Sequence, residues 1–432
     1  MNIKLFFIVY ITIYIHMLYI LLPNTHIIIY KAIGCYTKQE EPPIKYSPSL
    51  KSYLYEIKNK IDECEMQWDN YKKYTNPYEY INTLVPNKNK TVSAVKPLSR
   101  SYYKMIELVS FFNLCHYSSS TTFESSNTKR LNSIPIKSFH LAEGPGGFIE
   151  ALVHMRKNKN DTYVGMTILD NNNNDSNIPA WKKSKKFLND NNNVYIESGA
   201  DKTGNILSLS NFEHCCSKYG STMDIITADG GFDFSNDFNG QEKIMTKLLY
   251  GQVCYALCMQ KHNGSFILKI FDCFMENTID LLYILSAFYK DVYITKPQTS
   301  RYANSEKYVV CKNFLFTDCK DFYNIMKDTL KNTIETNEHI HRFLSIDISR
   351  HFKNKVEEYN AIAGQQQMET IQNTLNLIVN KTKTDKLDSI IKTNVSRCIK
   401  WCEKHNVEVN TFTSPSLNSF KLSSSPPDNI FI

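Results

Sequence analysis

A glycine-rich stretch, residues 140–150, most constrains how this chain can fold. It reads His-Leu-Ala-Glu-Gly-Pro-Gly-Gly-Phe-Ile-Glu and follows an apolar run, residues 136–142, that is typical of a short buried strand. Residues 148–155 begin a helical pattern. A strand, a glycine turn and a helix in this order form the nucleotide-binding corner of a doubly wound sheet. An ordinary tight turn has the same pattern, because the stretch is neither a Walker A loop nor a full G-x-G-x-x-G.

Apolar runs and helical patterns alternate from residue 136 onwards, which predicts a doubly wound α/β sheet that is mainly parallel and Rossmann-like. The segment between the last two strand candidates, residues 296–306, is too short for a parallel crossover, so the last strand should be antiparallel. The clearest helices are expected at 241–260 and 278–289. The seven strand candidates are residues 136–142, 162–168, 194–197, 224–228, 265–271, 292–295 and 307–311.

The flanking regions have a different character. Residues 5–22 are almost wholly apolar and aromatic, which indicates a cleaved signal, a membrane anchor or an upstream extension, so residues 1–36 are set aside from the fold. Residues 37–94 are a polar extension with one helix expected at 49–72. The sheet domain is expected at 95–315. Residues 316–432 should form a helical appendage with a polar tail, with helices at 318–334 and 355–399.

Composition limits the possible partners only loosely. A net charge of +7 permits a polyanionic partner without requiring one. The twelve cysteines include no C-x-x-C and no second pair at zinc spacing, so most should be reduced and buried, and no metal is expected.

Four charged residues in and around the predicted sheet are candidates for chemistry. Asp229 closes the strand at 224–228 and precedes two glycines, and Lys269 lies inside the strand at 265–271. A lysine buried there is costly unless it is paired or deprotonated, although its head could also reach water at the strand end. Glu306 begins the last strand, and Lys104 lies in a helix-like segment before the sheet. Taken singly, Glu306 and Lys104 would be ordinary surface charges.

The order and spacing of these residues resemble a known family. Lys104, Asp229, Lys269 and Glu306 match the Lys-Asp-Lys-Glu tetrad of FtsJ-like ribose 2'-O-methyltransferases. The sequence is similar to that family over residues 95–312, and most of all to its cap-type branch in large DNA viruses. The neighbouring motifs match too: Ser-Arg-Ser-Tyr-Tyr-Lys at 99–104, Glu-Gly-Pro-Gly-Gly-Phe at 143–148, Thr-Ala-Asp-Gly-Gly at 227–231, and Lys-Pro-Gln-Thr-Ser-Arg at 296–301 before Asn-Ser-Glu at 304–306.

The resemblance implies methyl transfer from S-adenosylmethionine to a ribose 2'-oxygen of RNA. A ribose near the mRNA 5' cap is the favoured substrate. Lys269 would be the general base, since the hydroxyl must lose its proton as it attacks. Burial and the nearby Lys104 favour the neutral amine. Asp229 and Glu306 oppose this, so they should orient Lys269 more than charge it, while Lys104 orients the substrate. The sulfonium is already a good leaving group, so no metal is needed.

The cofactor is expected at the glycine stretch. Its predicted contacts are Glu143, Gly144, Pro145, Gly146, Gly147, Phe148, Asp201 and Asp229. Asp201 would meet the adenine, but it could equally be a turn residue, and Asp170 is the rival acidic residue.

RNA contacts and the alternatives stay open. Lys182, Lys183, Lys185 and Lys186 beside Trp181 could track phosphates and stack a base, or could simply be a solvated face. Two other functions compete: methylation of ribosomal or transfer RNA, and a catalytically silent RNA-binding subunit of the same fold. Such a function places the protein in the cytoplasm or nucleus, unless residues 5–22 act as a membrane anchor or organelle signal. The sequence does not indicate an oligomeric state.

Overall fold

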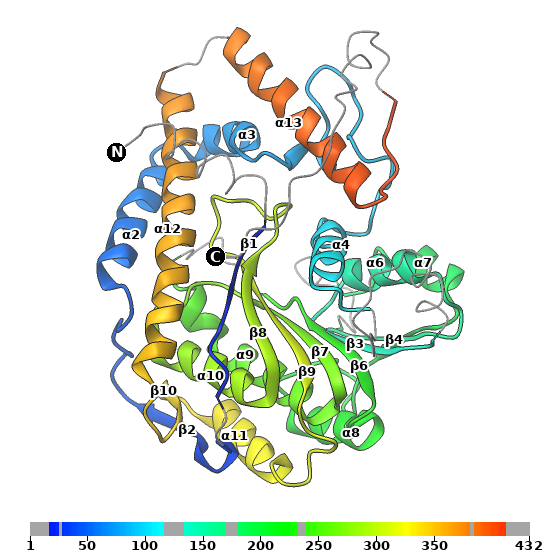
Figure 1. Ribbon diagram of the computed structural model, residues 1–432, viewed down its shortest axis with the longest axis vertical. Helices are drawn as coiled ribbons and strands as arrows, with labels where there is room; N and C mark the ends of the chain where they lie inside the picture. The colour runs from blue at the N-terminus through cyan, green and yellow to red at the C-terminus, as the bar shows by residue number, and fades with distance from the viewer. Residues whose placement is uncertain are drawn as a thin grey trace.

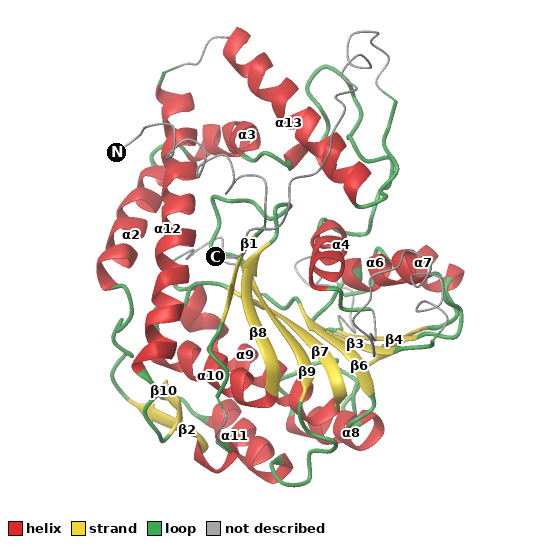
Figure 2. Ribbon diagram, viewed as in Figure 1, coloured by secondary structure: helices red, strands yellow, loops and turns green. Residues whose placement is uncertain are grey.

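The protein is described from a computed structural model over residues 17–25, 28–115, 134–169, 180–231, 239–380 and 384–411. Its centre is one eight-stranded sheet in the order β1-β8-β9-β7-β6-β3-β4-β5 (Figure 1, Figure 2). The strands are β1 (Leu18–Leu21), β3 (Lys137–Leu141), β4 (Thr162–Met166), β5 (Val194–Glu197), β6 (Met223–Ala228), β7 (Gln260–Ile270), β8 (Tyr289–Lys296) and β9 (Lys307–Phe314).

All seven predicted strands are present, and the predicted sheet class is confirmed. Strands β3 to β7 pair in parallel, and β9 is antiparallel to both β7 and β8. The 296–306 loop therefore closes a hairpin between β8 and β9, as its length required. The carboxyl ends of the parallel strands and this loop lie at the same edge of the sheet (Figure 1).

The eighth strand corrects the treatment of residues 1–36. Within the described part of that segment, β1 pairs antiparallel with β8, and β2 (Ile33–Lys38) pairs with β10 (His339–Leu344) in a second small sheet. Side chains in and after β1 alternate, since Tyr19 and Leu21 are exposed while Ile20 and Leu22 are buried. Because the exposed side chains are also apolar, the sequence shows an unbroken apolar run in place of the alternation of a strand.

A membrane-spanning helix is absent from the part of the chain that the structure describes. Residues 1–16, which hold most of the apolar run, lie outside the described residues. The expectation about cysteines is confirmed, because all twelve are free thiols and nine of them are buried.

Helices cover both faces of the sheet (Figure 2). One hydrophobic core packs α8 (Leu209–Tyr219), α9 (Gln241–Met259) and α10 (Glu276–Phe288) on one face. A second core packs α4 (Ser101–Phe112) and α6 (Gly147–Arg156) on the other, beside the short α7 (Lys185–Asp190). Helix α4 thus stands over the carboxyl edge of the central strands.

The two flanking regions pack together, although they are far apart in the sequence. The helix expected at 49–72 is two helices, α2 (Pro48–Asp62) and α3 (Glu65–Thr75), and both contact α12 (Arg350–Val379). Helix α13 (Thr384–Lys404) contacts α3 and the short helix η2 (Glu79–Ile81). The appendage also contains α11 (Tyr323–Glu335) and the strand β10, so it is not purely helical. Another short helix, η1 (Tyr30–Ala32), precedes β2.

Candidate active site

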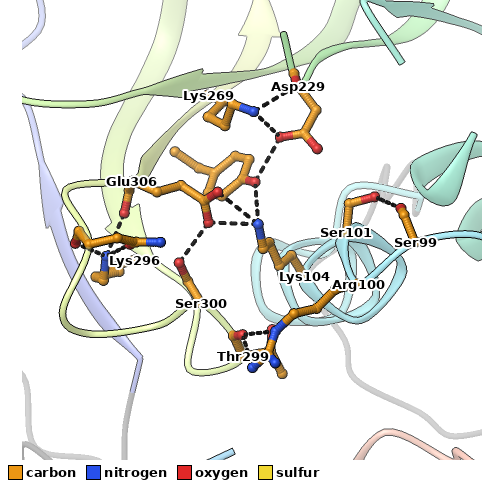
Figure 3. Close-up of polar contacts among 12 residues, drawn as sticks. Ser99, Arg100, Ser101, Lys104, Asp229, Lys269, Lys296, Thr299, Ser300 and Glu306 are labelled. Carbon is orange, nitrogen blue, oxygen red and sulfur yellow. Dashed lines mark hydrogen bonds and ion pairs between the residues drawn. The ribbon is translucent and has the colours of Figure 1, made fainter. Parts of the chain in front are cut away.

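The four charged residues predicted from the sequence meet at the carboxyl edge of the sheet (Figure 3). They come from separate elements: Lys104 from α4, Asp229 from the end of β6, Lys269 from β7 and Glu306 from the residue before β9. We call these four residues the tetrad. Parallel pairing of β6 with β7 sets Asp229 beside Lys269, and antiparallel pairing of β7 with β9 brings Glu306 to the same edge.

The tetrad forms two ion pairs. The Nζ of Lys269 donates to the backbone oxygen of Asp229 at 2.8 Å and lies 3.3 Å from its Oδ1. The Nζ of Lys104 lies 2.7 Å from Oε1 and 2.8 Å from Oε2 of Glu306. Glu306 is expected from the sequence to position Lys269, whereas its carboxylate pairs directly with Lys104.

The phenol of Tyr308, which the sequence analysis missed, connects the two pairs. Its hydroxyl donates to Oδ1 of Asp229 at 2.9 Å and lies 3.5 Å from the Nζ of Lys104. Tyr308 follows Glu306 by two residues in an extended segment, so both side chains point to the same face. That spacing was a signal available in the sequence.

Burial and charge make this network strongly polarised. The side chains of the tetrad expose only 12–14% of their area. Burial alone would raise the pKa of Glu306, but the ammonium groups of Lys104 and Lys269 outweigh it and lower that pKa to about 2. Burial, with Asp229 and Glu306 nearby, holds the pKa of Tyr308 well above its usual range, so the phenol stays protonated as a donor.

Glu143 lies beside the network at the end of β3. Its Oε1 accepts from the backbone N–H of Phe148 at 2.5 Å, at the start of α6. Its Oε2 is buried and has no hydrogen-bond partner among the described residues. Burial and the nearby Asp229 raise the pKa of Glu143 well above its ordinary value. A cationic ligand beside this carboxyl group would lower its pKa and stabilise the ionised form.

A family model described as FtsJ-like methyltransferase matches residues 97–314, which is half of the chain. The chain belongs to the FtsJ-like methyltransferase family.

Curated relatives of this FtsJ-like chain have similar descriptions. The cap-specific mRNA (nucleoside-2'-O-)-methyltransferase 2 of Danio rerio is 30% identical over 287 residues, which cover 62% of this chain and 34% of that protein. The cap-specific mRNA (nucleoside-2'-O-)-methyltransferase 1 of Trypanosoma brucei brucei is 39% identical over 119 residues, covering 27% of this chain and 32% of that protein. The chain therefore spans about a third of the length of these relatives.

A solved structure of human methyltransferase-like protein 13 in complex with SAH is 13% identical and covers 56% of this chain and 94% of that chain. Its TM-score is 0.32.

The glycines of the FtsJ-like loop allow close packing against neighbouring segments. A Cβ at Gly147 would lie 2.2 Å from the Oγ of Ser99 and 2.3 Å from that of Ser101, so this glycine lets α6 begin against the start of α4. Gly146 has a φ of +104°, which favours glycine. The loop is therefore shaped partly by packing against the segment that carries Lys104.

The 296–306 loop is held in place by buried polar contacts. The Nζ of Lys296 donates to three oxygens: the backbone oxygen of Asn304 at 2.8 Å, its Oδ1 at 2.9 Å, and the backbone oxygen of Glu306 at 2.7 Å (Figure 3). The Oγ of Ser300 donates to Oε1 of Glu306 at 2.6 Å. Glu107 of α4 accepts from the backbone N–H of Gln298 at 2.6 Å. None of these supports was identified from the sequence.

The other predicted binding residues lie apart from this network. Oδ1 of Asp201 accepts from the N–H and hydroxyl of Thr203 at 2.9 and 2.7 Å, and its Oδ2 accepts from Ser208 at 2.6 Å. This is the turn role that the sequence left open. Trp181 is buried, so it does not present a face to a base, although the four lysines beside it are exposed. Asp170 lies outside the described residues.

Proposed function

We propose that this chain transfers a methyl group from S-adenosylmethionine to a ribose 2'-oxygen of RNA close to the mRNA 5' cap. The observation that carries the proposal is the buried network of two lysine–carboxylate pairs joined by Tyr308 at the carboxyl edge of the sheet. Ligands bind at this edge in doubly wound sheets. A catalytically silent RNA-binding subunit would have no use for such a network.

The site fits the cofactor through charge. S-adenosylmethionine carries an ammonium and a sulfonium group, and it supplies the methyl group when bound. The unpartnered Oε2 of Glu143 and the nearby Asp229 are the acidic groups that could hold these cations. Residues 144–148, which follow Glu143 in the chain, are further cofactor contacts predicted from the sequence. The adenine contact predicted for Asp201 is the weakest assignment, because local bonds occupy both of its carboxylate oxygens.

Lys269 is suited to accept the proton of the ribose hydroxyl. In the deprotonated form that a general base requires, its amine has two N–H groups and one lone pair. The backbone oxygen and Oδ1 of Asp229, at 2.8 and 3.3 Å, provide an acceptor for each N–H, which leaves the lone pair for the substrate. Asp229 thus orients the base. Lys104, fixed by Glu306, is the cation that would orient the incoming ribose or phosphate.

The preference for a capped end rests on the relatives, two of which are described as cap-specific mRNA methyltransferases. Ribosomal or transfer RNA remains the alternative substrate of the same chemistry.

The experiment is methyl transfer with labelled cofactor to matched capped and uncapped RNAs. Lys269→Ala should bind the cofactor normally and lose at least about 100-fold in methyl transfer. Lys290→Ala, an exposed lysine on β8, is the matched control and should keep full activity. Normal methylation by the Lys269 variant would show that the base is misassigned. Equal activity on capped and uncapped RNA would contradict the cap preference alone.

A further inference from the structure

A large cavity borders the 296–306 loop. Its volume is about 1200 Å³, and residues from the end of α3, from α12 and from α13 line it. The family match ends at residue 314, so α12 and α13 lie beyond it. Two residues of the loop, Gln298 and Tyr302, also line the cavity.

The cavity wall is basic. Four of its lining side chains are cationic, and none of the lining residues is acidic. Three of the cations, Arg397, Lys400 and Lys404, are spaced by three and four residues, so they share one face of α13. The fourth is Lys386. No ion pair to any of these four occurs within the described residues, and all four are exposed. Cations without protein partners around a cavity favour an anionic ligand.

The opposite wall offers neutral hydrogen-bonding groups. Asn373, Asn376 and Asn380 follow one another at helical spacing along α12 and line the cavity. Such amides can donate to phosphate oxygens and sugar hydroxyls alike. A cavity with cations on one side and amides on the other suits a hydrated phosphodiester chain.

The cavity and the tetrad share contacts with the 296–306 loop. Ser300, which donates to Glu306, lies between the lining residues Gln298 and Tyr302 in the same loop. The backbone N–H of Gln298 donates to Glu107, one helical turn from Lys104 on α4. A chain bound in the cavity would therefore pass next to the segment that fixes Glu306 and Lys104.

We propose that this cavity binds phosphates of the RNA whose ribose the tetrad methylates, and that it does not hold the methylated guanine of the cap. The inference rests on the proposed function and assigns it an RNA subsite. A 7-methylguanine base carries a positive charge, and a wall with four cations and no carboxylate repels it. The phosphates of the same RNA are attracted.

The test compares two double variants of the full chain that remove equal charge. Arg397→Gln with Lys400→Gln removes two cavity cations. Lys331→Gln with Lys392→Gln removes two exposed lysines that do not line the cavity. Dissociation constants for a short single-stranded RNA are measured across a series of salt concentrations. Each lost phosphate contact should reduce the salt slope by about 0.7, so the cavity variant should lose about 1.4, and the control should be close to wild type.

Three matched RNAs identify the source of the phosphates: one with a methylated cap, one with an unmethylated guanosine cap, and one with a 5'-monophosphate. Equal weakening for all three supports binding of the chain phosphates. Weakening confined to the two capped RNAs supports binding of the triphosphate bridge. Weakening confined to the methylated cap, or a slope equal to that of the control variant, would overturn the inference.

Methyl transfer by the same proteins separates this inference from the proposed function. If the wild type binds RNA through the cavity but methylates none of the three RNAs, the proposed function fails and the subsite stands. If the wild type methylates RNA and the cavity variant keeps the full salt slope, the subsite fails and the proposed function stands. For the cavity variant we expect a higher KM for RNA, with kcat at saturating RNA unchanged.

Discussion

At the scale of single residues, Tyr308 decides whether the tetrad acts as one unit. Its hydroxyl bonds to Asp229 and lies near Lys104, so it couples the pair that holds the base to the pair that holds the second cation. The raised pKa of Tyr308 keeps the proton on the phenol, so its role is to donate and to orient, and it does not act as a base.

Tyr308→Phe should lower kcat by about tenfold and leave cofactor affinity unchanged. A hydrogen bond to a charged group is worth about 1.5 kcal/mol or more, which corresponds to about a factor of ten in rate. Steady-state kinetics and a cofactor titration measure the two effects. Tyr289→Phe is the control, because Tyr289 is also buried and donates to Gln260 at 3.0 Å at the other end of the sheet. Equal losses of kcat in both variants would point to a general effect on folding.

The sequence was sufficient to find the tetrad but not to pair its members. Asp229 and Lys269 could be placed together because consecutive parallel strands end at the same edge. The partner of Glu306 depends on where α4 stands over that edge, which no spacing along the chain determines. The two acidic residues predicted to bind the cofactor also differ in their surroundings. Glu143 follows β3 and lies beside the tetrad, whereas Asp201 lies in a turn whose own N–H groups bond its carboxylate.

At the scale of elements, the 296–306 loop is the part of the hairpin that aims Glu306. A buried amine closes this loop, since Lys296 donates to two oxygens of Asn304 and to the backbone oxygen of Glu306. Few sequence patterns would reveal such a bond, because its acceptors are mostly backbone atoms.

Lys296→Met should reduce kcat more than it raises the KM for RNA, because it loosens the segment that fixes Glu306 without removing a binding group. It leaves buried oxygens without donors, at a cost of about 2 kcal/mol in the free energy of unfolding. Kinetics and urea unfolding measure the two effects. Lys290→Met, on the exposed start of the same strand, should change neither. A change in stability with unaltered kinetics would contradict the positioning role.

Strands with mostly apolar sequences were predicted near their observed bounds, whereas a strand with a largely polar sequence was missed. Buried parallel strands such as β4 and β6 are short, mostly apolar runs, so their positions could be predicted within about two residues. The strand β10 reads His-Ile-His-Arg-Phe-Leu and pairs only with β2, which the sequence analysis had set aside. A polar edge strand whose partner is 300 residues away has no local signature.

At the scale of the whole molecule, one buried carboxylate joins three regions. Glu79 of η2 is fully buried and bonds Arg301 of the 296–306 loop at 2.8 and 3.1 Å. It also lies 3.0 Å from Arg100, next to the start of α4. The N-terminal extension is therefore tied to both elements that carry the Lys104–Glu306 pair. The sequence predicted the extension as a separate segment and gave no sign of this link.

Glu79→Gln should lower the free energy of unfolding by about 2 kcal/mol at pH 7, because it leaves two partly exposed guanidinium groups without the buried carboxylate that pairs with them. Burial opposes ionisation, but Arg301 and Arg100 outweigh it and lower the pKa of Glu79 to about 2 from an ordinary value of 4.5. Its stabilisation is therefore fully present above pH 4.5 and is lost as the pH falls towards 2.

The difference in unfolding free energy between wild type and Glu79→Gln should consequently be large at pH 7 and 5 and should shrink by pH 3. Urea unfolding at these three pH values measures it. Glu41→Gln is the control, because Glu41 pairs with Lys243 at the exposed surface and should contribute little at any pH. A difference that stays constant from pH 7 to pH 3 would mean that the packing of Glu79, and not its charge, joins the extension to the active-site loop.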